Sequence, residues 1–331
     1  MYMLAIDTGK TKTIAVLLDD TLNVLSYGIA GPADITLGRE LIIRNLSDAI
    51  NSCLKGVGLS LRELDLIVIS WAGLDTKADY KLAENYAREL GLSPDKTSII
   101  HDAISAFYTV TWGNPGIAVI AGTGAIAYGM NKRGETARSS GWGWLFGDEG
   151  SSSWIALQAL NAASRAYDER GEETSLVDRL KEYFGVKDLL DIIPIIYQNK
   201  LYDDISAIAR IAVIVDEEAQ KGDRVARRIL ERAGYELALS AYSVAKKLGM
   251  EGDRDIIVGG VGSVYRSRIV RASFEENVRR FLPYAMIKEP ITGYKAVLGS
   301  IIYGLRLKGY SIDQEVVDKV SSGIDRVLGR E

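Results

Sequence analysis

Cysteine and histidine are almost missing from this chain. Its 331 residues include one cysteine, Cys53, and one histidine, His101. A disulfide within the chain needs two cysteines, and zinc sites are built mainly from several cysteine and histidine ligands, so these counts exclude both. Acid-base chemistry must therefore fall mainly to carboxylates.

Long apolar runs and an excess of positive charge are absent as well. No apolar stretch reaches the ~18 residues of a membrane span, and no basic leader precedes the first apolar segment, so we expect a cytoplasmic protein without a membrane partner. The formal net charge is −4. Because affinity for phosphate backbones comes from clustered lysine and arginine, we expect no nucleic-acid partner. The sequence leaves open whether the chain forms a homodimer.

The length and the repeated pattern of elements indicate two α/β domains. The chain has 331 residues, more than the about 250 to 300 at which a single core usually stops growing. Predicted strands alternate with helices, which favours a largely parallel sheet. The strand–turn–strand pattern of residues 4–18 recurs at residues 116–130, as in two related domains. We predict domains at residues 1–113 and 114–307, with a C-terminal helix at about residues 308–331 packing back on the first.

Hydrophobic periodicity predicts the remaining elements. Strands are predicted at residues 22–29, 66–70, 97–101 and 255–258, and helices at residues 37–54, 77–90, 223–248, 293–307 and 314–328. The glycines of residues 259–262 predict a tight turn after the last of these strands.

The first candidate site is the turn DTGKTKT at residues 7–13. Backbone amides, hydroxyls and lysines in such a turn can bind phosphate, and a carboxylate at the strand end can hold hydrated Mg²⁺. Taken alone, the segment also fits an ordinary β-hairpin turn. It is not a Walker A loop, because Leu4 stands where that motif needs glycine. The candidate nucleotide-binding residues are Asp7, which is also the candidate metal ligand, Gly9, Lys10, Thr11, Lys12 and Thr13.

A second glycine turn, AGTGAIA at residues 121–127, follows another apolar strand. It matches the loose G-x-G-x-x-A dinucleotide pattern, but that site needs a helix directly after the glycines, and a strand is predicted there instead. We therefore interpret Gly122, Thr123 and Gly124 as a second phosphate clamp.

Asp102 lies where a predicted strand ends and a helix begins. It is equally compatible with a helix N-cap and with a general base, since strand ends of α/β sheets face the ligand crevice and a carboxylate there can take a proton from an alcohol that attacks a phosphoryl group. We interpret His101 as a packing residue at the strand end.

The densest motif is GWGWLFGDEGS at residues 141–151. A loop so rich in glycine gains no stability from its backbone, and adjacent carboxylates with aromatics suit a small polar sugar site. A purely structural loop remains an alternative. The candidate sugar-binding residues of this loop are Trp142, Gly147, Asp148 and Glu149.

These motifs, and their order along the chain, resemble those of the N-acetylglucosamine kinases and related archaeal hexokinases of the actin/Hsp70/sugar-kinase superfamily. This family is related to the dehydratase-activator type of ATPase. The resemblance covers nearly the whole chain. It implies a two-domain, actin-like and ribonuclease H-like α/β fold with a cleft between the domains, and an ATP- and Mg²⁺-dependent kinase. The substrate it implies is a hexose or hexosamine (glucose, glucosamine or N-acetylglucosamine), phosphorylated at the 6-OH.

The resemblance also assigns roles to individual residues. Asp102 matches the catalytic aspartate of the family, and Thr123 matches a residue that binds the sugar. VGGVG at residues 258–262 resembles the adenosine motif, which implicates Gly259, Gly260 and Val261. GPAD at residues 31–34 and WAGL at residues 71–74 resemble loops on the sugar side, which implicates Asp34, Ala72 and Gly73.

The chain departs from the family at several of these positions. Asp34 stands where the family usually has asparagine, Ala125 and Ile126 replace a Ser-Asn pair, and Thr8 and Lys10 replace glycines of the first turn. An ionised aspartate only accepts hydrogen bonds, so a hydroxyl or an amine is the expected partner of residue 34 rather than an acetamide carbonyl.

Two alternative functions share this fold by resemblance. ATPase activators of 2-hydroxyacyl-CoA dehydratases hold an iron–sulfur cluster between subunits through cysteines, and Cys53, inside a predicted helix, is the one candidate here. Non-catalytic sugar-binding regulators usually carry an added DNA-binding region, and none is apparent.

Overall fold

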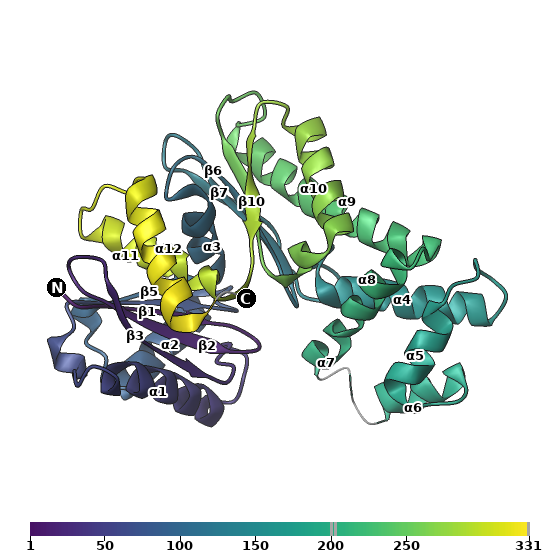
Figure 1. The fold of residues 1–331 in the computed structure, drawn as a ribbon, viewed down its shortest axis with the longest axis horizontal. Coiled ribbons are helices and arrows are strands. Elements are labelled where there is room, and N and C mark those ends of the chain that lie inside the picture. The colour runs from purple at the N-terminus through teal and green to yellow at the C-terminus, as the bar shows by residue number, and fades with distance from the viewer. Residues whose placement is uncertain (199–200, 202–203, 330–331) are drawn as a thin grey trace. The chain divides into compact units, whose positions relative to one another are not determined.

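The structure is a computed structural model that describes residues 1–198, 201 and 204–329. It divides into two compact units (Figure 1). Unit 1 comprises Met1–Asn114 and Ile291–Glu331, and unit 2 comprises Pro115–Pro290. The first boundary lies one residue from the expected one, and the second lies at residue 290 instead of 307.

Unit 1 is built on a five-stranded sheet of order β3-β2-β1-β4-β5. Strands β1, β4 and β5 are parallel, whereas β2 is antiparallel to both β1 and β3. The strands are β1 Met3–Thr8, β2 Thr13–Leu18, β3 Val24–Ala30, β4 Leu66–Trp71 and β5 Thr97–His101. The helices are α1 Arg39–Lys55, α2 Lys77–Glu89, α3 Asp102–Thr111, α11 Leu298–Leu307 and α12 Gln314–Leu328, with short 3-10 turns at η1 Leu61–Glu63, η2 Pro94–Lys96 and η6 Gly293–Val297.

Alternating residues of the strands bury both faces of this sheet. Leu4 and Ile6 of β1 pack in one cluster with α1 and α2. Met3 and Ala5, which point the other way because side chains alternate along a strand, pack in a second cluster with α11 and α12. Figure 1 shows α1 on one face of the sheet and the yellow helices α11 and α12 on the other. A sheet covered on both faces explains why the parallel strands β1 and β4 are mostly apolar.

The position of α11 corrects the predicted second boundary. We expected residues 293–307 in the second domain, but α11 packs on α3 and on the sheet of unit 1. A Cβ on Gly299 would lie 1.8 Å from the carbonyl oxygen of Ser105, and one on Gly304 would lie 2.6 Å from the sulfur of Met3. These two close contacts tie α11 to unit 1, and periodicity along the chain cannot reveal them.

Unit 2 contains a second five-stranded sheet, of order β10-β9-β6-β7-β8. Its strands are β6 Gly116–Ala121, β7 Ala125–Met130, β8 Thr136–Ser140, β9 Ile257–Val261 and β10 Met286–Ile291. Its helices are α4 Ser152–Tyr167, α5 Leu176–Phe184, α6 Ile192–Tyr197, α7 Ile205–Ala209, α8 Ile211–Gln220, α9 Arg224–Leu248 and α10 Arg268–Phe281, with 3-10 turns at η3 Leu189–Asp191 and η5 Ser263–Arg266.

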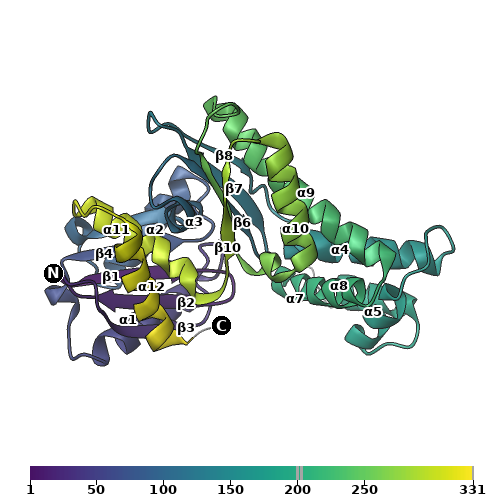
Figure 2. The same cartoon turned by 45° about the horizontal axis from the view of Figure 1, so that its top comes forward.

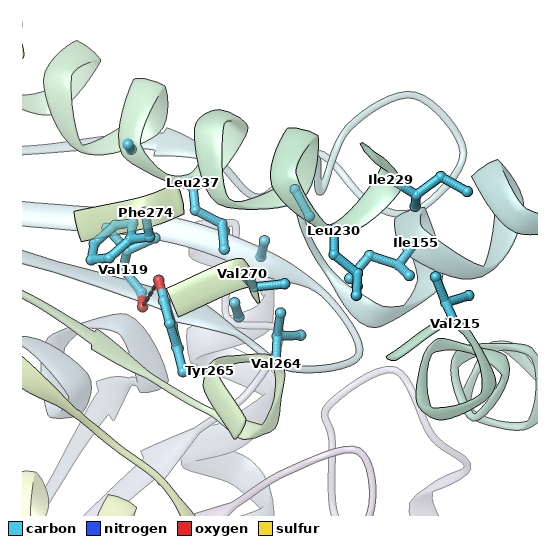
Figure 3. Packing of buried hydrophobic residues seen from close by; sticks show 14 of the residues in the cluster. Val119, Ile155, Val215, Ile229, Leu230, Leu237, Val264, Tyr265, Val270 and Phe274 are labelled. Atoms are coloured by element: carbon cyan, nitrogen blue, oxygen red, sulfur yellow. Dashed lines mark hydrogen bonds between the residues drawn. The ribbon is translucent and has the colours of Figure 1, made fainter. Parts of the chain in front are cut away.

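One hydrophobic cluster joins the sheet of unit 2 to its helices. Helix α10 lies alongside α9 (Figure 2), and Gly234 of α9 permits this, because a Cβ there would lie 2.5 Å from the carbonyl oxygen of Val270. Figure 3 shows Tyr265 reaching into the cluster, where its hydroxyl donates to the carbonyl oxygen of Val119 at 3.2 Å. Within the described ranges, no helix has the length and apolar character that a membrane crossing requires.

Two elements near the end of unit 2 differ from the sequence prediction. The predicted turn at residues 259–262 is wrong for its first three residues, because β9 continues through Val261 and pairs Gly259 with Ala118 and Gly260 with Val119 of β6. Strand β10 was not predicted. It contains Pro290 and has no fully buried residue, which suits an edge strand and weakens its sequence signal.

Candidate active site

The parallel strands of unit 1 bring three predicted site segments to one edge of its sheet. Asp7 of β1 lies opposite Ser70 of β4, and Trp71 of β4 lies opposite His101 of β5. The carboxyl ends of β1, β4 and β5 therefore coincide. Residues 8–13, the loop after Trp71 and the start of α3 all leave the sheet at this edge, where α/β proteins bind their ligands.

The first turn is anchored at its base and exposed at its tip. The amide of Gly9 donates to the carbonyl oxygen of Lys12 at 3.0 Å, and the hydroxyl of Thr13 donates to the carbonyl oxygen of Gly31 at 2.8 Å. Lys10 and Thr11, at the tip, are exposed. The turn thus presents a hydroxyl and a cation from a fixed base, as a phosphate-binding turn requires.

Asp7 has the electrostatics of a carboxylate that needs a cation. Burial raises its pKa to about 7, and the negative charge of Asp102 adds to this shift, while Ser70 and the cation of Lys12 partly oppose it. No group of three or more acidic, cysteine or histidine side chains that could hold a metal occurs among the described residues. Mg²⁺ nevertheless fits here, since it commonly uses one or two carboxylates and completes its shell with water and substrate phosphates.

Asp102 opens α3 and lies against its neighbour His101. Atom Nδ1 of His101 is 2.7 Å from Oδ1 of Asp102, and Nε2 is 3.9 Å from Oδ1 of Asp75. The predicted N-cap role belongs to His101, which is the N-cap residue of α3. Asp102 is the first helical residue, so its carboxylate is not needed to cap the helix, and its side chain keeps 29% of its surface exposed.

The loop that carries Asp34 is held from several sides. Trp71 donates its indole N–H to the carbonyl oxygen of Ala33 at 2.7 Å, and Asn45 donates its amide to that of Pro32 at 2.6 Å. Oδ1 of Asp34 accepts the amide of Thr36 at 2.9 Å and its hydroxyl at 2.5 Å. The other carboxylate oxygen, Oδ2, is buried and has no hydrogen-bond partner among the described residues.

Ala72 and Gly73 lie beside Asp34, as the resemblance implies. The amide of Ile35 donates to the carbonyl oxygen of Ala72 at 3.2 Å. Gly73 has a φ of 82°, and a Cβ there would lie 3.2 Å from Oδ1 of Asp34. The left-handed backbone and the close approach both require glycine at this position.

In unit 2, the second turn is tied to the start of α4. The amide of Ser152 donates to the carbonyl oxygen of Gly122 at 2.8 Å, and the hydroxyl of Ser153 donates to that of Thr123 at 2.6 Å. The turn itself closes through the amide of Gly122 and the carbonyl oxygen of Gly124 at 2.9 Å. The first two residues of α4 therefore fix the shape of the turn.

The segment at residues 141–151 places its two carboxylates differently. Asp148 is buried, has a φ of 54°, and accepts the amide of Gly143 at 3.2 Å through Oδ1. Glu149 is half-buried, and its Oε2 lies 3.4 Å from the hydroxyl of Ser140. Trp142 is 64% exposed. The loop therefore combines a fixed buried carboxylate with an accessible aromatic surface, and the buried Gly147 lies close to Trp142, where a Cβ would come within 2.7 Å of the tryptophan Cβ.

The predicted adenosine residues Gly259, Gly260 and Val261 are buried in β9. Packing explains one of the glycines, because a Cβ on Gly260 would lie 2.4 Å from the ring of Tyr265. Gly262, the next residue, has a φ of 123°, and its Cβ would lie 2.4 Å from the carbonyl oxygen of Ala121. The end of β9 therefore adjoins the start of the second turn.

The structure thus gathers the predicted residues into two sets. Unit 1 holds Asp7, the first turn, Asp34, Ala72, Gly73 and Asp102, and unit 2 holds the second turn, the segment at residues 141–151 and the end of β9.

Comparison with known protein families identifies the family of this chain. Residues 4–304 match the model of the BadF/BadG/BcrA/BcrD ATPase family. The chain belongs to this family.

Curated relatives match this chain over nearly their full lengths. The chain is 33% identical over 304 residues to the N-acetylmuramic acid/N-acetylglucosamine kinase of Clostridium acetobutylicum, which covers 91% of this chain and 97% of that protein. It is 29% identical over 294 residues to the N-acetyl-D-glucosamine kinase of Dictyostelium discoideum, covering 86% and 92% of the two chains. The resemblance to N-acetylglucosamine kinases is therefore confirmed.

Solved structures share the fold of this ATPase. The putative N-acetylglucosamine kinase of Chromobacterium violaceum matches with a TM-score of 0.70 at 20% identity, over 91% of this chain and 98% of that one. The corresponding putative kinase of Porphyromonas gingivalis matches with a TM-score of 0.72 at 15% identity, over 94% and 100%. The predicted actin-like α/β fold is confirmed.

Several residues that hold the predicted site residues in position were not identified from the sequence. Thr36 follows Asp34 by two residues, and an Asp-x-Thr turn pattern could have revealed it. Ser153 has no local signal, because its partner Thr123 lies 30 residues away. His101 was assigned to packing, yet its ring lies between two carboxylates.

Proposed function

We propose that this protein is an ATP-dependent carbohydrate kinase that transfers the γ-phosphoryl group of ATP to the 6-OH of a hexose or hexosamine. The observation that carries the proposal is the placement of Asp102 at the strand-end edge of unit 1, paired with His101 and close enough to Asp7 to raise its pKa. Family membership and relatives named as N-acetylglucosamine kinases support the substrate class.

Asp102 is the general base of the proposed reaction. Its carboxylate takes the proton of the sugar hydroxyl while the oxygen of that hydroxyl forms a bond to the γ-phosphorus. The bond between the γ-phosphorus and the bridging oxygen breaks, and ADP leaves. Phosphoryl transfer needs little covalent chemistry from the protein, so positioning and charge stabilisation supply most of the rate.

The two glycine turns and Asp7 serve the nucleotide. Asp7 and water would hold Mg²⁺, which neutralises charge on the phosphates when it is bound. The exposed tip of the first turn offers Lys10 and a hydroxyl to phosphate oxygens. In unit 2, Gly122 and Thr123 are half-buried at the end of β6, where their backbone can approach a phosphate.

The sugar is assigned to the remaining predicted residues. Asp34 and Asp148 are buried carboxylates in hydrogen-bonded loops, which suits the recognition of paired hydroxyl donors. Trp142 offers an exposed ring, and aromatic faces complete many small polar sites.

The activator function has less support from this chain. Cys53 is buried in α1, and burial raises the pKa of its thiol to about 12. A cluster ligand must be a thiolate that faces its metal. The one cysteine of the chain therefore suits a core position rather than a cluster between subunits.

An ADP-release assay tests the proposal directly. The purified protein would be given Mg²⁺ and ATP with glucose, glucosamine, N-acetylglucosamine or mannose, each in turn. We expect release of ADP that depends on the sugar, and formation of the corresponding sugar 6-phosphate. If none of these sugars stimulates ADP release, the kinase assignment fails.

A further inference from the structure

We propose that His101 is a positioning residue that holds Oδ1 of Asp102, so that Oδ2 is the atom left to receive the proton of the substrate. This inference rests on the proposed kinase function. It assigns a role to the one histidine of the chain, which the sequence analysis interpreted as a packing residue.

The contact between the two side chains is short and enclosed. Nδ1 of His101 lies 2.7 Å from Oδ1 of Asp102, and the imidazole is only 13% exposed. Oδ1 is buried and accepts no hydrogen bond of good geometry from any described residue, His101 included, so the 2.7 Å approach is a charge contact. A buried carboxylate oxygen without a donor is costly, and a cation at this distance compensates for it.

Two neighbours compete for Nδ1. The amide of Ala103 approaches it at 2.9 Å, in the geometry of a helix cap. A neutral nitrogen can accept that amide, whereas a protonated one can instead donate to Asp102, and one nitrogen cannot do both. The charge on the ring therefore decides which contact forms.

The surroundings of the ring favour the protonated form. Asp75 lies on its other side, with Oδ1 3.9 Å from Nε2. Burial lowers the pKa of His101, but the charges and hydrogen bonds of Asp102 and Asp75 outweigh it and raise that pKa to about 10. Protonation removes Nδ1 as the acceptor of the Ala103 amide, and the attraction of the two carboxylates must exceed this cost.

The imidazolium also balances charge at this edge of unit 1. Asp7 and Asp102 repel each other, as the raised pKa of Asp7 shows, and Asp75 adds a third carboxylate. His101 lies next to two of the three, and Lys12 acts on Asp7. A fixed cation behind Asp102 keeps its carboxylate in one orientation while phosphates with like charge are bound.

Kinetics of the variant His101→Asn test the assignment. Asparagine can cap α3 by accepting the amide of residue 103, as the neutral imidazole does, but it supplies no charge. We expect kcat to fall about 10- to 100-fold with KM for ATP within about twofold, and the acidic limb of the kcat profile to move to higher pH because the cation beside the base is gone. Asp75→Asn, which keeps the contact with Asp102, should produce a smaller change in the same direction. An unchanged kcat, or a lower kcat with an unmoved acidic limb, would overturn the proposal.

A second measurement does not depend on sugar turnover. With a single histidine, the imidazole can be titrated by NMR without ambiguity. We expect His101 to titrate above pH 9 in the wild type and at least one unit lower in Asp102→Asn. Titration near the ordinary value of 6.5 in both proteins would overturn the contact itself. If the contact is present but no sugar is phosphorylated, the kinase function fails and the His101–Asp102 pair stands.

Discussion

A Cβ on Gly124 would lie 2.7 Å from Oδ2 of Asp148. The second glycine turn and the segment at residues 141–151 are therefore in contact through a residue that has no side chain. Asp148 cannot easily give way, because it is 4% exposed and its other oxygen accepts the amide of Gly143. A candidate phosphate-binding turn and a candidate sugar-binding carboxylate thus depend on each other within unit 2.

This relationship predicts that Gly124→Ala damages the site. The added methyl group must displace Asp148 or the turn, so we expect a loss of about 1 to 3 kcal/mol in the free energy of unfolding and a higher KM for the sugar. Chemical denaturation and steady-state kinetics would measure the two effects.

Gly122→Ala is the matched control for this prediction. Apart from its two chain neighbours, no described residue has an atom within 4 Å of a Cβ at Gly122, and its φ is not positive. We expect its free energy of unfolding to stay within about 0.5 kcal/mol of the wild type. Equal destabilisation by both substitutions would contradict the role of the contact with Asp148.

Much of this fold could be predicted from periodicity, and the exceptions have physical causes. Strands β1, β2 and β4 of unit 1 are mostly apolar and bounded by turn residues, so their positions follow from sequence. Strand β10 is half-exposed and contains Pro290, so it gives no such pattern. The location of α11 depends on glycines that meet α3 and β1, which are contacts across about 190 residues or more of sequence that no local signal encodes.

Asp7→Asn should raise the stability of the protein at pH 8 and abolish its activity. At pH 8, above the raised pKa of about 7, the wild type keeps a charged carboxylate in a mostly enclosed place, whereas the unfolded chain holds the same charge in water. Folding is therefore less favourable as pH rises from about 4 to 7. We expect the variant to be more stable than the wild type at pH 8, by about 2 kcal/mol after allowance for the partial exposure of Asp7.

The same pair of proteins at pH 5 provides the control. Asp7 is then protonated in the folded wild type, so the advantage of the variant should shrink. Thermal denaturation without nucleotide or metal would measure both differences, and Mg²⁺-dependent turnover should be lost in the variant at either pH. A stabilisation that is equal at the two pH values would show that the charge of Asp7 is not its cause.

Asp34→Asn should change the choice of sugar. Oδ1 of the asparagine can still accept both hydrogen bonds from Thr36, so the substitution mainly replaces the unpartnered acceptor Oδ2 by a donor. We expect kcat/KM for N-acetylglucosamine relative to glucosamine to rise about tenfold, since an amide can donate to a carbonyl and a carboxylate cannot. Asp95→Asn, on an exposed residue of unit 1, is the control. A ratio that is unchanged would remove Asp34 from substrate selection.

The identity of the candidate site residues was more predictable than their environment. Asp7, Asp34 and Asp102 follow from motifs, because each lies at the end of a strand or in a loop with a characteristic pattern. The environment of the Asp34 oxygen results from the folding of its loop, and Asp75 comes close to His101 because β4 and β5 lie side by side in the sheet. Sequence shows which groups are present, but the fold determines which of their atoms remain available.

The assignment of Asp102 as the base gives the most direct prediction. Asparagine keeps the size of the side chain and its place at the start of α3 but cannot take a proton. General-base catalysis contributes about 10² to 10⁴-fold, so Asp102→Asn should lower kcat by that factor. The affinity for ATP should remain, because the glycine turns are untouched, and equilibrium binding of a non-hydrolysable ATP analogue would measure it. Near-normal sugar phosphorylation by this variant would remove Asp102 from the mechanism, whereas loss of both turnover and ATP binding would indicate that Asp102 supports the nucleotide site instead.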